Sequence, residues 1–317
     1  KNILCLYGTK KISIDLLGCS SQNYTLHSNL FIEKKIKIKS FNDYEQKLKR
    51  ININFDQKER KKIILKEAEK IKNKKGLNFI MNQQLIDEVV NLVESPNVFL
   101  GQFNKKYLKL PNEVLTTSMI KNQKYFPLFY KDNTLSNFFL IVSNLKPSDN
   151  GKKIIYGNQR VIEARLEDAS FFWMKDNNSN FKDKAEELKR VIFHNKLGSV
   201  HDKILRLKKI ATFFAENIKL DNKSQRNLEV SINICKNDLV AELVREFPSL
   251  QGIMGFYYAQ QSGFNNDVCN AIKEQYKPNG PHDFCPTTKL SQILALIDKM
   301  DTLVGLFIID LAPTSSK

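Results

Sequence analysis

The stretch GNQRVIEARLEDASFFW, residues 157–173, predicts an α-helix where the composition of the chain changes. Its apolar side chains recur at the i, i+4, i+7 and i+11 positions of one stripe, namely Ile162, Leu166, Ala169 and Trp173. Arg165 and Asp168 lie in the row beside this stripe, at a spacing that lets them form an ion pair. The pair could be catalytic, could bind a ligand, or could be an internal salt bridge.

The residues before this helix predict a mixed α+β domain. Short runs rich in β-branched or alternating residues predict strands over 3–7, 11–17, 24–32, 35–39, 98–103, 123–130 and 137–144. Helices are expected from Phe41 after a Ser40 cap, from an Asp56 cap to a stop at Gly76, over 82–94, and briefly after Pro111.

The residues after Pro147 predict helices only. Beyond the quoted helix, helical periods cover 181–196, 201–218, 223–244, 249–262, 264–276 and 288–309. A run of strands and helices followed by a run of helices is typical of the α+β class. We therefore predict an α+β domain over residues 1–160 and an all-helical domain over residues 161–317.

The positive charge is concentrated near the start of the chain. The formal net charge is +16, and residues 1–76 contribute 19 Lys and Arg against 8 Asp and Glu, a net of +11. Such a face attracts polyanions such as RNA. Drift in an AT-rich genome also produces lysine-rich chains, so the charge does not by itself indicate an RNA partner. The charged helix expected at 57–75 is therefore interpreted either as a solvent-exposed surface or as an RNA contact.

The cysteines and the absent motifs exclude several classes of protein. Five cysteines without a C-x-x-C pair argue against a disulfide framework and a zinc ribbon, and they favour the reducing cytoplasm. No apolar run reaches membrane-spanning length, and no signal peptide is evident. Nucleotide-binding loops of the G-x-G-x-x-G and Walker A types are absent. Because the chain starts without Met, we expect an excised piece of a longer protein.

Two His-Asp doublets raise the alternative of a metal-dependent HD-type phosphohydrolase. In such a site, imidazoles and carboxylates from several helices hold a metal that activates water. However, His201-Asp202 follows His194 too closely for that arrangement, and His282-Asp283 lies in a Pro/Gly loop that favours a turn or cap. We therefore expect no metal site in this chain.

A different alignment resembles the HD scaffold without its chemistry. Asn237-Asp238 stands where HD domains carry His-Asp, Asp298 stands at the late aspartate, and Arg206 and Lys209 stand where the early histidine should lie. Because Lys236 and Lys299 neighbour the two carboxylates, we predict buried salt bridges rather than metal ligands.

Six blocks in order carry a more specific resemblance. They are DEVVNLVESPNVFLGQFNKKYLKLPNEVL (87–115), NQKYFPLF (122–129), GNQRVIEARLEDASFF (157–172), LGSVHDK (197–203), CKNDLVAELVREFPSLQGIMGFYYA (235–259), and DKMDTLVGLF with PTSSK (298–307 and 313–317). Together they resemble the β subunit of the bacterial heterotetrameric glycyl-tRNA synthetase. The first 80 residues match more loosely, with His27 kept but its neighbours changed.

The resemblance implies a non-catalytic subunit. In that family the separate α subunit activates glycine with ATP, and the β subunit holds the glycine tRNA and supports the α dimer in an α2β2 assembly. The α+β part would resemble the B3/B4 module of the phenylalanyl enzyme, and the helical part would be HD-like. The resemblance implies a central fragment that has no catalytic residue, binds no cofactor itself and contacts no membrane. A general basic RNA-binding module remains an alternative.

The candidate site residues fall into two groups. RNA- or partner-contact candidates are Arg160, Arg165, Gln123, Lys124 and Tyr125. The structural remnants of an HD-like site are Asp202, Lys203, Asp238 and Asp298. For Arg165 we weigh a buried bridge with Asp168 against contact with phosphate or the α subunit, and for Tyr125 we weigh core packing against stacking on an RNA base.

Overall fold

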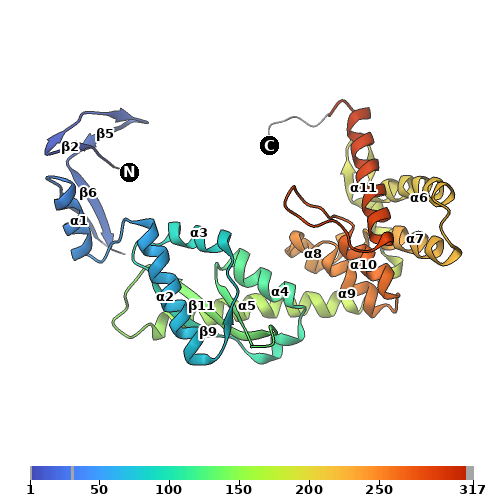
Figure 1. The fold of residues 1–317 in the computed structure, drawn as a ribbon, viewed down its shortest axis with the longest axis horizontal. Coiled ribbons are helices and arrows are strands. Elements are labelled where there is room, and N and C mark those ends of the chain that lie inside the picture. Colours follow the sequence, from blue (N-terminus) through green and yellow to red (C-terminus); the bar gives the residue numbers. More distant parts are fainter. Residues whose placement is uncertain (1, 30–31, 312–317) are drawn as a thin grey trace. The chain divides into compact units, whose positions relative to one another are not determined.

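A computed structural model describes residues 2–29 and 32–311 of the chain (Figure 1). The chain divides into two compact units. The first unit comprises Lys1–Gln102 and Lys124–Arg160, and the second comprises Phe103–Gln123 and Val161–Lys317. Both strands and helices are present, as predicted for the α+β class, whereas the two domains proposed from the sequence stay a prediction.

An antiparallel sheet forms the centre of the first unit. Its strand order is β8 (Asn78–Phe79), β10 (Phe126–Phe129), β11 (Leu135–Ser143) and β9 (Asn97–Gln102). Helix α2 (Gln57–Lys75) packs against β9 and β8 of this sheet, and α3 (Gln83–Leu92) packs against α2 (Figure 1). Gly101 is required in β9, because a Cβ there would lie 2.5 Å from the Phe139 ring. The buried ring of Phe139 therefore fixes how closely the edge strand β9 approaches β11.

The start of the chain forms shorter strands than the sequence predicts. The structure has β1 (Ile3–Leu4), β2 (Leu6–Tyr7), β3 (Lys10–Lys11), β4 (Asp15–Leu16), β5 (Cys19–Gln22), β6 (Tyr24–Asn29) and β7 (Ile32–Lys37). The single strands expected over 3–7 and 11–17 are each divided, and residues 30 and 31 of the expected 24–32 strand lie outside the described residues.

The predicted helix caps of the first unit are confirmed. Ser40 accepts a hydrogen bond from the Asp43 amide at the start of α1 (Phe41–Arg50), and Asp56 accepts from the first turn of α2. Gly76 ends α2 with a φ of 65°, which a residue without a Cβ adopts most easily. Much of the lysine-rich surface of α2 forms exposed ion pairs, such as Lys70 with Glu67.

The second unit consists mainly of helices. They are α4 (Asn112–Thr117), α5 (Lys152–Asn177, of which the part from Val161 belongs here), α6 (Val200–Asn217), α7 (Asn222–Ile234), α8 (Glu242–Glu246), α9 (Ile253–Gln261), α10 (Asn266–Glu274) and α11 (Lys289–Ile308). The apolar stripe of α5 is confirmed: Ile162, Leu166 and Ala169 are buried, and Trp173 stacks on Tyr258 at 5.5 Å between ring centroids.

Two expectations for the second unit are wrong. The segment predicted as a helix over 181–196 forms 3-10 turns followed by a hairpin of β12 (Ile192–His194) and β13 (Gly198–Ser199), in which Gly198 adopts a φ of 84°. The helix predicted over 223–244 ends at Ile234. It breaks there because the Asn237 and Asp238 side chains turn inward and bind backbone groups elsewhere in the unit.

Candidate functional site

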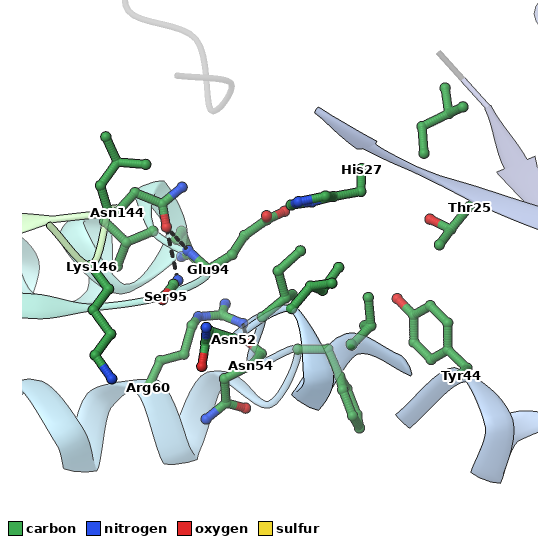
Figure 2. A pocket seen from close by; sticks show the side chains of 18 residues that line it. Thr25, His27, Tyr44, Asn52, Asn54, Arg60, Glu94, Ser95, Asn144 and Lys146 are labelled. Carbon is green, nitrogen blue, oxygen red and sulfur yellow. Dashed lines mark hydrogen bonds between the residues drawn. The ribbon is translucent and has the colours of Figure 1, made fainter. Parts of the chain in front are cut away.

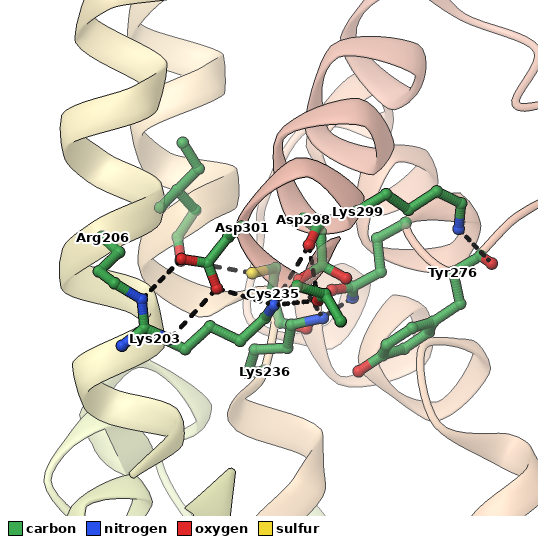
Figure 3. A network of polar contacts seen from close by, with 11 residues as sticks. Lys203, Arg206, Cys235, Lys236, Tyr276, Asp298, Lys299 and Asp301 are labelled. Atoms are coloured by element: carbon green, nitrogen blue, oxygen red, sulfur yellow. Dashed lines mark hydrogen bonds and ion pairs between the residues drawn. The ribbon is translucent and has the colours of Figure 1, made fainter. Parts of the chain in front are cut away.

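A buried network of opposite charges lies between α6, α7 and α11 of the helical unit (Figure 3). Asp298 on α11 forms ion pairs with Lys236 Nζ at 3.0 Å and with Lys203 Nζ at 3.3 Å. All three residues are at most 8% exposed. The predicted salt bridge of Asp298 with Lys236 is therefore present, whereas Lys299 donates to the carbonyl of Tyr276 instead.

A second carboxylate, Asp301, completes the network one turn further along α11. Arg206 donates to both of its oxygens, from Nε at 2.6 Å and from Nη2 at 3.2 Å. Lys203 lies 3.1 Å from the same carboxylate and also donates to the Thr302 hydroxyl at 2.6 Å. Lys203 thus links the two aspartates, and we name Lys203, Arg206, Lys236, Asp298 and Asp301 the ion cluster.

Aromatic rings and neighbouring charges surround the buried groups of the ion cluster. Lys236 Nζ lies 4.1 Å from the centroid of the Tyr276 ring, and Lys203 Nζ lies 4.5 Å from that of Phe193. Burial by itself would raise the pKa of Asp298, but the ammonium groups of Lys236 and Lys203 hold that pKa below its ordinary value. The carboxylate lone pairs that could hold a metal ion are directed at ammonium groups instead.

Asp238 is also buried, but the salt bridge predicted for it is wrong, because its carboxylate binds backbone amides. Its Oδ2 accepts hydrogen bonds from the amides of Gly252 at 2.5 Å and Gly255 at 3.2 Å, and thereby fixes the first turn of α9. A Cβ on Gly255 would lie 2.7 Å from Ile272, so this approach requires glycine. Within the described part of the chain, Oδ1 of Asp238 has no hydrogen-bond partner. Burial raises the pKa of Asp238 to about 6.

The raised pKa of Asp238 predicts an unusual pH dependence of stability. Because the folded state holds this proton more tightly than the unfolded state, the free energy of unfolding should increase as pH falls from about 7 towards 4, by up to about 1.4 kcal/mol per pH unit. Asp238→Asn should remove this contribution, which urea unfolding of both proteins across that range measures. Parallel pH profiles of the two proteins would contradict the assignment.

One His-Asp doublet caps a helix, and the other lies in a loop. Asp202 forms a capping box with Ser199 at the start of α6, accepting from its amide at 2.8 Å, so it lies outside the ion cluster. Asp283 accepts from the amides of Asn279 and Phe284 within its loop. Within residues 2–29 and 32–311, no group of three or more His, Cys, Asp or Glu side chains is arranged to hold a metal ion. The ion cluster is thus built for charge neutralisation.

Comparison with known proteins identifies the family. The sequence profile described as "Glycyl-tRNA synthetase beta subunit" matches residues 1–317. The chain belongs to this family. It is 38% identical over 316 residues to the glycine–tRNA ligase beta subunit of Syntrophomonas wolfei, covering 99% of this chain and 45% of that protein. It is 39% identical over 318 residues to the beta subunit of Rickettsia felis, covering 100% and 46%. The chain thus spans less than half the length of these relatives.

In this member of the beta-subunit family, Arg165 does not form the buried pair with Asp168 that was one of the two interpretations of its sequence. Arg165 and Asp168 are both exposed, and the ion pair of Arg165 is with Glu246 at 3.3 Å. The row beside the apolar stripe therefore faces solvent, since only the stripe itself is buried. Arg160 is exposed and lies over the ring of Tyr156. Both arginines stay candidates for RNA or partner contact.

The candidates around Tyr125 differ in accessibility. Tyr125 is 4% exposed, stacks on Phe139 at 4.8 Å between centroids, and donates to Asn158. Tyr125 thus packs in the core, the interpretation weighed against base stacking, and its role in RNA or partner contact stays a prediction. Burial raises its pKa to about 12. Lys124 pairs with Glu88 at 2.7 Å, and Gln123 is half-buried, so their roles stay predictions.

The first unit contains a polar pocket of about 850 Å³ (Figure 2). His27, the residue that the loosely matching segment keeps, lies on its wall. Arg60 is held at the base by the carbonyls of Val90 and Asn54, and Asn144 accepts hydrogen bonds from the amides of Glu94 and Ser95. Since its wall includes both signs of charge, the lining alone selects no ligand charge.

Sequence reasoning missed two buried aspartates. Asp301 belongs to the ion cluster, and Asp176 on α5 accepts hydrogen bonds from the amides of Glu242 and Leu243 and from the Tyr258 hydroxyl. For Asp301 a signal existed, because it lies three residues after Asp298 on the same face of an otherwise apolar helix. For Asp176 no local pattern was informative, since its partners lie 66 to 82 residues away.

Proposed function

We propose that this chain is part of the non-catalytic beta subunit of a tetrameric glycine–tRNA ligase. It would help to bind the glycine tRNA and to support the alpha-subunit dimer, while the alpha subunit activates glycine with ATP. The observation that carries this proposal is the match of the family profile to the entire chain. The whole assembly would be an aminoacyl-tRNA ligase in the cytoplasm, and this chain would contribute no catalytic side chain.

We further propose that the first unit is B3/B4-like and that the helical unit is HD-like without HD chemistry. The ion cluster supports the second assignment. Asp298 and Asp301 are neutralised by Lys203, Lys236 and Arg206, so an approaching metal ion would have to displace ammonium and guanidinium groups from buried carboxylates. Such a unit can hold and position other molecules, which is the role expected of a supporting subunit.

The charge of the chain supports a role in RNA binding. Residues 1–76 contain 19 basic and 8 acidic residues. They therefore contribute a net charge of +11 to the formal charge of +16. Exposed lysines can neutralise phosphates and release counterions, which makes affinity sensitive to salt. Arg160 is an exposed candidate, and the guanidinium of an arginine can bind a phosphate through two hydrogen bonds.

Binding of glycine tRNA to the complete alpha–beta assembly tests this proposal. We expect the affinity for tRNA to fall steeply as the salt concentration rises. If Arg160 binds a phosphate, Arg160→Ala should reduce the slope of log affinity against log salt concentration by about one. Lys189→Ala is the matched control, because Lys189 is an exposed cation already paired with Glu186. If the alpha subunit alone bound this tRNA as tightly as the complete assembly does, the proposal would be contradicted.

A further inference from the structure

Helix α11 carries apolar side chains on two opposite faces. Its inner face is buried and includes Leu294, Ile297 and the ion-cluster residues Asp298 and Asp301. Its outer face is formed by Leu296, Met300, Leu303 and Phe307, and these side chains are 38% to 54% exposed. A helix at the surface of a protein normally carries polar residues opposite its core. The outer face of α11 therefore lacks its covering.

The exposed side chains form one continuous row. Leu296, Met300, Leu303 and Phe307 are spaced at i, i+4, i+7 and i+11, so they line a single ridge about 17 Å long. Val304 lies beside this ridge, and Lys299 lies on its other flank. Ridges of this spacing pack into the groove of another helix. An exposed apolar patch of this size and regularity marks an interaction site.

The length of the relatives indicates what covers this row. The chain spans 45% and 46% of two beta subunits, so more than half of their length lies outside the part that it matches. We propose that the α11 row docks an amphipathic helix from the beta-subunit polypeptide outside residues 1–317. This inference rests on the proposed function, because it takes the working protein to be the longer subunit.

The physical reasons favour a covering helix from the same polypeptide. A segment tethered to the unit is present at a high effective concentration, so it covers the row without needing a second molecule. A covering segment of the same subunit keeps the row out of water at every protein concentration. Removing this apolar surface from water stabilises the native state. Helix against helix is the arrangement that the spacing of the four ridge residues fits.

Thiol labelling of the full-length beta subunit tests this inference. Leu303→Cys places a thiol in the middle of the row, and Lys66→Cys, on the exposed face of α2, provides the matched control. Alkylation is followed site by site by mass spectrometry, so the native cysteines do not interfere. We expect the thiol at 303 to react about tenfold or more slowly than the thiol at 66, because a covered site reacts only when the structure opens locally.

Each other outcome overturns the inference in a different way. Equal rates at the two sites in the isolated subunit would show that the row is open. Protection at 303 only after the alpha subunit is added would assign the row to that partner, and protection that increases with beta-subunit concentration would assign it to a second copy. Because labelling needs neither tRNA nor glycine, failure here is distinguishable from failure of the proposed function.

Discussion

Asp298→Ala is expected to lower the free energy of unfolding of the helical unit by about 3–5 kcal/mol. Among the described residues of the ion cluster, Asp298 is the only carboxylate within ion-pair distance of Lys236. The substitution therefore leaves the buried ammonium group of Lys236 uncompensated. Urea unfolding followed by the fluorescence of Trp173 measures the loss, because Trp173 is the only tryptophan of the chain and packs on Tyr258 in the same unit.

The control and the pH dependence make the Asp298 prediction specific. Glu186→Ala removes an exposed carboxylate that pairs with Lys189, and it should leave the unfolding midpoint unchanged. Because the folded-state pKa of Asp298 is lowered, its contribution is present above the ordinary carboxyl pKa and is lost as pH falls through the folded value. If Asp298→Ala were as stable as the unsubstituted chain at neutral pH, the ion cluster would not be holding the helices together.

Asp176→Ala is expected to destabilise the same unit by about 3 kcal/mol. Two backbone amides at the start of α8 and the Tyr258 hydroxyl, which lies 2.8 Å from Asp176 Oδ2, would lose their buried acceptor. Burial and the Asp176 carboxylate together raise the pKa of Tyr258, in agreement with this hydrogen bond. The same urea titration measures the change, since Trp173 stacks directly on Tyr258.

A matched substitution separates the hydrogen bonds of Asp176 from its charge alone. Asp183→Ala removes a nearby exposed carboxylate whose partner is Asn180, and we expect no shift of the unfolding midpoint. Asp176→Asn keeps one oxygen acceptor and should therefore lie between Asp176→Ala and the unsubstituted chain. Equal stability of Asp176→Ala and Asp183→Ala would show that Asp176 does not fix α8 to α5.

Local signals in the sequence predicted much of the fold because they act through neighbouring residues. Ser40, Asp56 and Gly76 stand at the helix ends that they cap, since a cap depends on only a few backbone groups. The buried stripe of α5 followed from the helical period alone. The chain's family could be predicted because six motifs recur in a fixed order.

Contacts distant in sequence explain what the sequence did not predict. The apolar period continues past Ile234, but α7 ends there because Asn237 and Asp238 bind Phe181 and Gly252, which no local pattern shows. Arg165 was expected to pair with Asp168 on its own helix, yet its partner is Glu246, 81 residues away. Whether the residues next to an apolar stripe are buried depends on the helix that packs there. The helical period alone therefore overestimated the burial of Arg165 and Asp168.

Among residues 2–29 and 32–311, no helix has both the length and the hydropathy needed to span a membrane. The five cysteines, all in the described residues, are free thiols. The free thiols agree with the sequence, in which no C-x-x-C pair occurs. The cytoplasmic location stays a prediction.

Glycylation of the glycine tRNA by separated and recombined subunits tests the central claim most directly. The claim is that this chain supports catalysis and does not perform it. We predict that the full-length beta subunit alone forms no glycyl-tRNA with ATP and glycine, and that adding it to the alpha subunit produces robust charging. Charging by the beta subunit alone, or full charging by the alpha subunit without it, would contradict the claim.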